Sequence, residues 1–104
     1  MIQFIKNILG IGPKVDLGEL IQNGAVIVDV RTPNEFKSGN VKGSINIPLD
    51  ALMNNLNKID KNKTIITCCA SGARSGMAKR LLKTNGYEVH NGGSWTSVRN
   101  YVKH

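Results

Sequence analysis

Cysteine, histidine and aromatic residues are scarce in this sequence, and each scarcity excludes a class of protein. The two cysteines, Cys68 and Cys69, are adjacent and cannot form an unstrained disulfide, so a disulfide-stapled secreted scaffold is excluded and a reducing compartment, the cytoplasm, is predicted. His90 and His104 are the only histidines, and adjacent cysteines lack a metal-ligand spacing, so we expect no metal site. Aromatic residues make up 5% of the chain, too few for a platform on which bases stack.

Long hydrophobic runs and acidic residues are also lacking. No apolar run approaches the ~20 residues that a membrane span needs, so no integral membrane span is expected. The chain has 104 residues, which fits one domain, and its 40% hydrophobic content is that of a globular protein. Lys and Arg number 14 against 7 acidic residues, but they are scattered singly along the chain. We therefore expect no nucleic-acid partner, and two interpretations of the charge remain: a solvated basic surface, or a field that attracts small anionic substrates.

The first 14 residues differ in pattern from the rest. Apolar side chains recur there at helical spacing, which predicts a short N-terminal amphipathic segment over 1–14, followed by a single domain over 15–104. The apolar part is short and is interrupted by Lys6, unlike a signal peptide. Three roles stay open for this segment: packing on the domain, mobility, or contact with a membrane surface.

Strand-like and helix-like segments alternate along the remaining chain. Short apolar, β-branched runs predict strands over 25–30, 44–47, 64–69 and 87–90. Helical spacing and capping residues predict helices over 15–23, 33–38, 49–57, 74–84 and 94–102. This alternation indicates an α/β fold with a mainly parallel sheet and helices on both faces. In such folds ligands bind beyond the carboxyl ends of the strands.

One of these carboxyl ends carries the most informative segment, which runs from Thr64 to Ser75. A buried strand ends in Cys69, and a helix begins at about Arg74 or Ser75. The small residues between them allow the backbone to curl around one point, where its N–H groups converge. Those N–H groups and the helix N-terminus favour a thiolate, and Arg74 adds a cation nearby. We predict Cys69 as an activated nucleophile and, as substrate-binding residues, the loop members Ala70, Ser71, Gly72, Ala73, Arg74 and Ser75.

Neighbouring residues have less certain roles. Side chains alternate across a strand, so Cys68 faces away from the loop and is predicted to be a buried structural residue. Asp29 ends a buried strand, and for it we favour accepting hydrogen bonds from the backbone or from an arginine over direct catalysis. Two hypotheses stand for Arg31, namely attraction of an anionic substrate at the pocket mouth and an ion pair with Glu35. For Trp95 we favour core packing over a place in the pocket wall.

Several segments in consistent order resemble the single-domain rhodanese family of sulfurtransferases, over about residues 15–101. The matching segments are the loop CASGARS at 69–75, DVRTPNEF at 29–36, GNVKGSINIP at 39–48, GYEV at 86–89 and GGSW at 92–95. Asn40 stands where histidine is common in the family. The resemblance implies a sheet of about five strands with helices on both sides and a reaction that needs no cofactor. In that reaction Cys69 takes a sulfane sulfur from a donor such as thiosulfate, forms a persulfide and passes the sulfur to cyanide or a thiol.

Three other functions compete with a free sulfurtransferase. A cysteine-dependent phosphatase needs Cys-x5-Arg, whereas Cys69 and Arg74 give Cys-x4-Arg, a loop one residue short for gripping a phosphoryl group. A non-catalytic rhodanese-like binding module is expected to lack the nucleophile, which is present here. A persulfide carrier that delivers sulfur to a partner protein has the same site residues, so the sequence leaves this alternative open.

Overall fold

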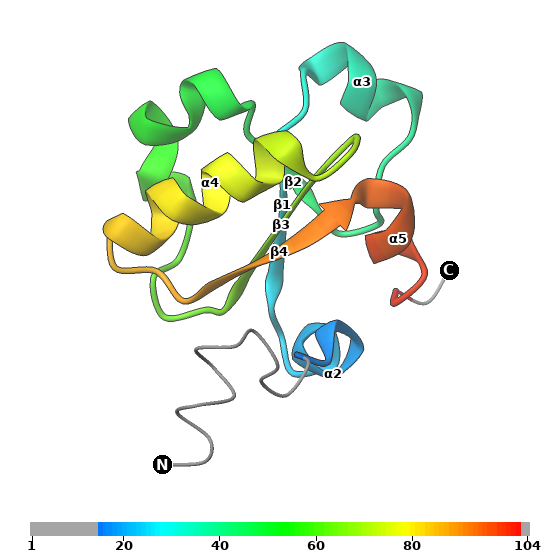
Figure 1. The fold of residues 1–104 in the computed structure, drawn as a ribbon, viewed down its shortest axis with the longest axis horizontal. Coiled ribbons are helices and arrows are strands. Elements are labelled where there is room, and N and C mark those ends of the chain that lie inside the picture. Colours follow the sequence, from blue (N-terminus) through cyan, green and yellow to red (C-terminus); the bar gives the residue numbers. More distant parts are fainter. Residues whose placement is uncertain (1–14, 103–104) are drawn as a thin grey trace.

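Four parallel strands form the centre of the computed structural model, which describes residues 15–102. The strands are β1 (Val26–Asp29), β2 (Ile45–Asn46), β3 (Ile65–Cys69) and β4 (Val89–Ser94), in the spatial order β2-β1-β3-β4 (Figure 1). The expected count of about five strands is corrected to four within the described residues. The sequence itself offers only four apolar β-branched runs, and the fifth strand rested on the resemblance. The predicted N-terminal segment lies outside the described residues.

Helices cover both faces of the sheet, as the alternating pattern predicted. They are α2 (Leu17–Gln22), α3 (Pro33–Ser38), the 3-10 helix η1 (Leu49–Lys58), α4 (Ala73–Thr84) and α5 (Trp95–Arg99). One core lies between the sheet and the pair α4 and η1, where Leu52 and Leu82 are fully buried. A second core lies on the opposite face, where Ile66 and Val98 of α5 are buried and Leu20 of α2 packs against this cluster. The sheet is therefore the middle layer of three (Figure 1).

The helix over 49–58 takes a tighter form than its apolar spacing suggested. It is a 3-10 helix that begins after Pro48 without a side-chain cap, and Asn55 has non-helical dihedrals of φ −128° and ψ 23°. The Asn55 side chain donates to the Ala51 carbonyl oxygen at 2.7 Å. Asparagine side chains compete in this way with the regular backbone ladder, and the interruption at Asn55 follows from that competition.

The pairing of β3 with β4 contains a bulge that matters for the site. Thr67 pairs with Asn91 and Cys69 pairs with Ser94, so three steps on β4 match two on β3. Gly92 lies in the extra step, where an added Cβ would come within 2.6 Å of Val98 Cγ2 and 2.9 Å of the Thr67 carbonyl oxygen. Only glycine fits this close approach, which brings the end of β4 beside the end of β3.

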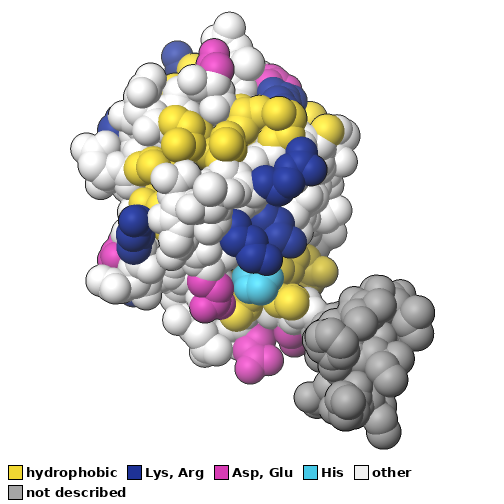
Figure 2. Space-filling model, turned by 60° about the vertical axis from the view of Figure 1, so that its left-hand side comes forward, with side chains coloured by type: hydrophobic (Ala, Val, Ile, Leu, Met, Phe, Trp, Pro, Cys, Tyr) yellow, Lys and Arg dark blue, Asp and Glu magenta, His cyan; other side chains and the backbone are white. Residues whose placement is uncertain are grey.

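The surface on the side of α4 and η1 carries hydrophobic side chains beside basic ones. Figure 2 shows a band of hydrophobic side chains there, with Lys and Arg next to it. Met53 of η1 and Met77 of α4 are 47% and 49% exposed. Within residues 15–102, no helix has the length and apolar character to cross a membrane.

Candidate active site

The Cys69 sulfur lies at the centre of the loop between β3 and α4. Its Sγ accepts hydrogen bonds from the backbone N–H of Gly72 at 3.0 Å and of Ser75 at 3.3 Å, and the Ser75 hydroxyl lies 3.4 Å away. Gly72 precedes the first residue of α4 and has φ +102°, a left-handed conformation that turns its N–H inward. The strand thus brings the sulfur to the sheet edge, and the loop surrounds it with donors at a helix N-terminus.

Burial and hydrogen bonding act on this thiol in opposite directions. The Cys69 side chain is 0% exposed, and this desolvation raises its pKa. Hydrogen bonding with the Ser75 side chain, and with the backbone N–H groups of Ser75, Gly72 and Ser71, lowers the pKa, and together these contacts outweigh burial. The net result is a pKa below the ordinary value for cysteine, which favours the thiolate that a nucleophile requires.

Cys68 occupies the opposite face of the sheet, as the alternation of side chains predicted. It packs with Ile27, Ile66 and Val98 in the second core, whereas Cys69 belongs to the first. Burial, reinforced by the nearby Asp29 charge, raises the pKa of the Cys68 thiol to about 12. Cys68 is therefore a neutral thiol at physiological pH, and both cysteines are free.

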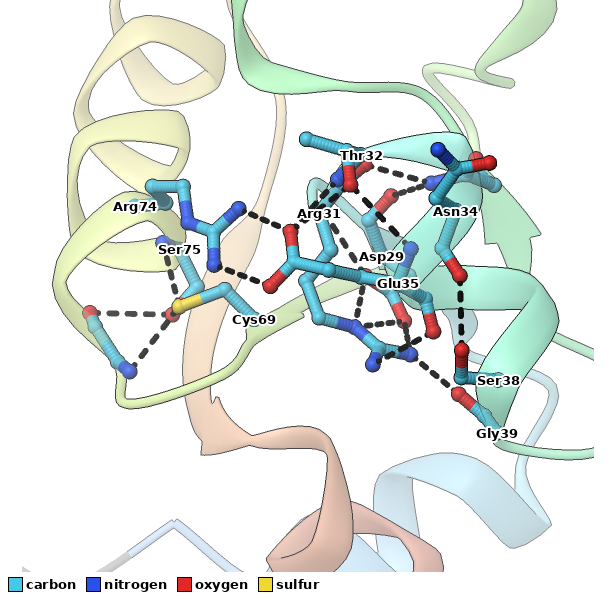
Figure 3. Close-up of polar contacts among 12 residues, drawn as sticks. Asp29, Arg31, Thr32, Asn34, Glu35, Ser38, Gly39, Cys69, Arg74 and Ser75 are labelled. Atoms are coloured by element: carbon cyan, nitrogen blue, oxygen red, sulfur yellow. Dashed lines mark hydrogen bonds and ion pairs between the residues drawn. The ribbon is translucent and has the colours of Figure 1, made fainter.

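Arg74, in the first turn of α4, makes a bidentate ion pair with Glu35 of α3. Nη1 lies 2.7 Å from Oε1 and Nη2 lies 3.0 Å from Oε2 (Figure 3). Glu35 also accepts a hydrogen bond from the Thr32 N–H at 3.0 Å, and Glu35 N–H donates to the Thr32 hydroxyl, so the two residues form a capping box. Hydrogen bonding to Arg74, then to Thr32, lowers the pKa of Glu35 to about 2. The carboxylate thus stays charged and holds the guanidinium at the rim of the loop.

Arg31 has a different partner from the one proposed in the ion-pair hypothesis. Its guanidinium pairs with Asp29, with Nη2 2.6 Å from Oδ2, and both side chains are buried. Asp29 also accepts the Arg31 backbone N–H at 3.0 Å, which confirms its predicted acceptor role. The remaining Arg31 contacts are to the carbonyl oxygens of Glu35 and Gly39, at 3.2 and 2.7 Å (Figure 3). The hypothesis of an Arg31–Glu35 ion pair is wrong, because Asp29 pairs with Arg31 and Arg74 pairs with Glu35.

These contacts engage four of the five N–H donors of Arg31, and its side chain is 4% exposed, so the attraction of a substrate by Arg31 stays a hypothesis. The guanidinium also lies 4.7 Å from the ring centre of Trp95, and Arg99 lies 5.0 Å from the same ring. Trp95 packs against the second core, as expected for core packing. Arg31 and Trp95 therefore stabilise the segment that follows β1.

The predicted loop residues surround Cys69 unequally. Ser75 is fully buried, Gly72 and Arg74 are half-buried, and exposed positions are Ala70, Ser71 and Ala73. A cavity of about 310 Å³ adjoins the loop at the carboxyl edge of the sheet and is lined by Val30, Thr32, Pro48, Leu49, Asp50 and Arg74. Among residues 15–102, no three His, Cys, Asp or Glu side chains are grouped to hold a metal ion.

The profile of the Rhodanese-like domain matches residues 14–100 of this chain. The chain belongs to the rhodanese-like domain family. This rhodanese-like chain also resembles individual proteins. It is 41% identical over 68 residues to YqhL of Bacillus subtilis, a match that covers 64% of the chain and 54% of YqhL. It is 39% identical over 74 residues to thiosulfate sulfurtransferase PspE of Escherichia coli, covering 68% of the chain and 71% of PspE.

Another Bacillus subtilis relative, putative sulfur carrier protein YrkF, is 35% identical over 75 residues, which cover 72% of the rhodanese-like chain and 38% of YrkF. Solved structures show the same fold. CoADR-RHD of Bacillus anthracis superposes with a TM-score of 0.73 and 36% identity, covering 92% of this chain and 18% of that one. A rhodanese with anions from Escherichia coli superposes with a TM-score of 0.65 and 35% identity, covering 71% and 91%. The matched segment spans about half of YqhL and a smaller share of YrkF.

Two contributors to this rhodanese-like site are not among the residues predicted from the sequence. Glu35 enters the sequence analysis only as a partner of Arg31, although the Thr32-x-x-Glu35 spacing is a signature of a capping box that fixes Glu35 near the sheet edge. The second contributor is Asn91, whose Oδ1 lies 2.6 Å from the Ser75 hydroxyl. No local pattern marks Asn91, because its position depends on the pairing of β4 with β3.

Proposed function

We propose that this protein is a sulfurtransferase in which Cys69 carries the transferred sulfur as a persulfide. The observation that carries the proposal is the pair of backbone N–H groups, from Gly72 and Ser75, directed at the Cys69 sulfur from the start of a helix. Such donors stabilise the anionic sulfur of the thiolate and of the persulfide that replaces it. The names of the relatives PspE and YrkF, a thiosulfate sulfurtransferase and a putative sulfur carrier, support the same chemistry.

The proposed reaction has two displacements at sulfur. The Cys69 thiolate attacks the outer sulfur of thiosulfate, an S–S bond forms, and sulfite leaves with the electron pair of the broken bond. An acceptor, either a thiolate or cyanide, then attacks the outer sulfur of the persulfide, and Cys69 leaves as the thiolate. Each bond made is matched by one broken, so the cycle needs no external oxidant, reductant or cofactor.

The surroundings of the loop suit an anionic donor. Arg74 holds a positive charge at the rim, and the chain has a formal net charge of +7. Cys69 is fully buried at rest, so the small exposed residues Ala70, Ser71 and Ala73 must move aside for the donor to reach the sulfur. The adjoining cavity, about 310 Å³ in volume, offers space beside Arg74 for the rest of a donor or acceptor. The cytoplasm is the proposed compartment, because two free cysteines persist in a reducing environment.

Delivery of the sulfur to a partner protein is the second candidate. It is favoured by the resemblance to putative sulfur carrier protein YrkF. A carrier would form the same Cys69 persulfide but transfer it slowly to small thiols. A phosphatase is a weaker candidate, because the chain from Cys69 to Arg74 is one residue shorter than phosphate-gripping loops need.

The test is sulfur transfer with a panel of donors and acceptors. We expect thiosulfate to add sulfur to the protein, detected by intact-protein mass spectrometry, and a small thiol or cyanide to remove it with turnover. Persulfide formation with slow release to every small acceptor would favour the carrier. Hydrolysis of p-nitrophenyl phosphate that disappears in Cys69→Ser, without persulfide formation, would move the assignment to a phosphatase.

A further inference from the structure

Asn91 of β4 joins the active-site loop to the bulged end of β4. Its Oδ1 accepts the Gly93 N–H at 2.9 Å and lies 2.6 Å from the Ser75 hydroxyl, and its Nδ2 lies 3.3 Å from the Gly72 carbonyl oxygen. Asn91 pairs in register with Thr67, whose hydroxyl donates to the Ser75 carbonyl oxygen at 2.9 Å. The bulge in β4 thus brings an exposed amide into contact with the residue that lies beside the Cys69 sulfur.

The neighbours of Asn91 determine the direction of its bond to Ser75. A backbone N–H can only donate and a carbonyl oxygen can only accept, so Gly93 and Gly72 together identify which amide atom is oxygen. That oxygen faces the Ser75 hydroxyl, so Ser75 is the donor. Ser75 has a single hydroxyl proton, and two oxygens lie within its reach: Asn91 Oδ1 at 2.6 Å and the Gly72 carbonyl oxygen at 3.1 Å. Asn91 is the nearer acceptor, and while the proton is directed at either oxygen only oxygen lone pairs face Cys69. The 3.4 Å contact between Cys69 Sγ and Ser75 Oγ is then donated by the thiol.

We propose that Asn91 is a positioning residue that competes with the Cys69 thiolate for the single hydroxyl proton of Ser75. The inference rests on the proposed function in taking Cys69 as the reacting group. When Cys69 loses its proton to solvent water, the Ser75 hydroxyl rotates from Asn91 to the sulfur and becomes a further donor beside the backbone N–H groups of the loop. Asn91 opposes that rotation, because its Oδ1 then keeps only the Gly93 N–H.

This competition adjusts the reactivity of the thiolate. A thiolate that is strongly stabilised by hydrogen bonds forms at lower pH but attacks more slowly, since nucleophilicity falls with basicity. Because Asn91 competes with the thiolate for the Ser75 hydroxyl proton, the Cys69 thiolate stays more basic and more nucleophilic than it would be in the loop without Asn91. The charged or titratable groups on the elements around the loop remain in place when Asn91 is changed; they are Arg74, Glu35, Asp29, Arg31, Cys68 and His90.

The test replaces Asn91 with leucine, which has a similar shape and no acceptor. The rate of iodoacetamide alkylation of Cys69 is measured against pH in a Cys68→Ser background. We expect the midpoint to fall by about half to one pH unit, the value of one hydrogen bond. The limiting rate above the midpoint should fall by about 2- to 3-fold, as the lower basicity requires. Asn91→Asp, which keeps an acceptor oxygen, should not lower the midpoint.

A double variant distinguishes the Ser75 proton from the backbone contact to Gly72. In a Ser75→Ala background, Asn91→Leu should leave the midpoint unchanged, because the proton in competition is gone. A midpoint that rises or stays constant in Asn91→Leu alone, or falls equally in the Ser75→Ala background, overturns the proposal. Asn57→Leu, at an exposed position of η1, is the matched control and should change neither quantity. Thermal unfolding confirms that each variant compared is folded.

Alkylation does not require sulfur transfer, so the two proposals fail separately. If thiosulfate adds sulfur to Cys69 but Asn91→Leu does not lower the midpoint, only the role of Asn91 is wrong. If the midpoint falls as expected but no donor yields a persulfide, the proposed function is wrong and the competition for the Ser75 proton stands.

Discussion

Glu35 and Arg74, 39 residues apart in sequence, meet through two parallel hydrogen bonds of 2.7 and 3.0 Å. Glu35 is also part of the capping box of α3, so this ion pair joins the helix after β1 to the helix after β3. Both side chains are about one-third exposed, at 34% and 37%, which places the pair at the surface of the site and within reach of solvent. The relationship has consequences for stability and for catalysis.

Replacing Glu35 with glutamine should destabilise the protein near neutral pH but not in acid. Hydrogen bonding to Arg74 lowers the pKa of Glu35 from 4.5 to about 2. Because the pKa of Glu35 is lower in the folded protein than in the unfolded chain, its charge stabilises the fold at pH values above 4.5. That contribution is lost as the pH falls toward 2. Glutamine still completes a capping box, so the variant isolates the charge. Melting temperatures of both proteins from neutral pH downward should converge as pH 2 is approached. Glu19→Gln, in α2, is the control, and a constant difference across this range would contradict the ion-pair explanation.

Arg74→Ala should slow the uptake of sulfur from thiosulfate by about 10- to 100-fold, the effect of losing a charge-assisted contact worth ~1.5–3 kcal/mol. The substitution removes the cation and leaves the Glu35 carboxylate unbalanced beside the loop. Adding Glu35→Gln should therefore restore part of the rate, measured by stopped-flow or quenched mass spectrometry. Complete recovery in the double variant would show that Arg74 acts only by neutralising Glu35.

Exchange of each cysteine for serine should separate their roles. Cys69→Ser should abolish persulfide formation, because the only sulfur within reach of the Gly72 and Ser75 N–H groups is removed. Cys68→Ser should retain most of it, since Cys68 packs on the opposite face of the sheet. Intact-protein mass spectrometry after thiosulfate treatment measures the added sulfur. Sulfur on Cys69→Ser, but not on Cys68→Ser, would reverse the assignment.

Alkylation by iodoacetamide should also distinguish the two thiols. In Cys68→Ser, the midpoint for Cys69 should lie below the ~8.5 of a free cysteine, because the loop donors outweigh burial. In Cys69→Ser, the remaining Cys68 should resist alkylation throughout the neutral range, since burial raises its pKa to about 12. The rates are measured against pH in the folded protein. A Cys69 midpoint at or above the free value is incompatible with donors directed at the sulfur.

Gly72→Ala should raise the Cys69 midpoint in addition to destabilising the fold. Gly72 has φ +102°, where a side chain costs about 1–2 kcal/mol, and relaxation of this strain moves its N–H away from the sulfur. Gly43→Ala is a matched control, because Gly43 has φ +85° with nothing within 4 Å of an added Cβ. Both variants should lose similar thermal stability, and only Gly72→Ala should shift the alkylation midpoint. An equal shift of the Cys69 midpoint in both variants would mean that general loss of stability, and not the displaced Gly72 N–H, causes it.

Local sequence determined much of the fold and the identity of the nucleophile. The β-branched run 65–69 is a strand, and the period of two in a strand places Cys68 and Cys69 on opposite faces. The run of small residues that follows is compatible with a tight loop and a helix start, and α4 begins at Ala73, within one residue of the predicted boundary. The Thr32-Pro33 pair predicted the start of α3 at Pro33, because capping acts within one helical turn.

Tertiary structure alone decided which distant residues complete the site. The sequence alone does not decide which acidic residue pairs with which arginine. Only the packed arrangement pairs Asp29 with Arg31 and Glu35 with Arg74. Asn91 reaches Ser75 because a bulge in β4 sets the register against β3. The Glu35–Arg74 and Ser75–Asn91 contacts link residues 39 and 16 positions apart, and no periodicity within one segment specifies them. The sequence therefore specified the sulfur and its loop, whereas the packing of strands and helices selected the charges and hydroxyl partners that adjust its reactivity.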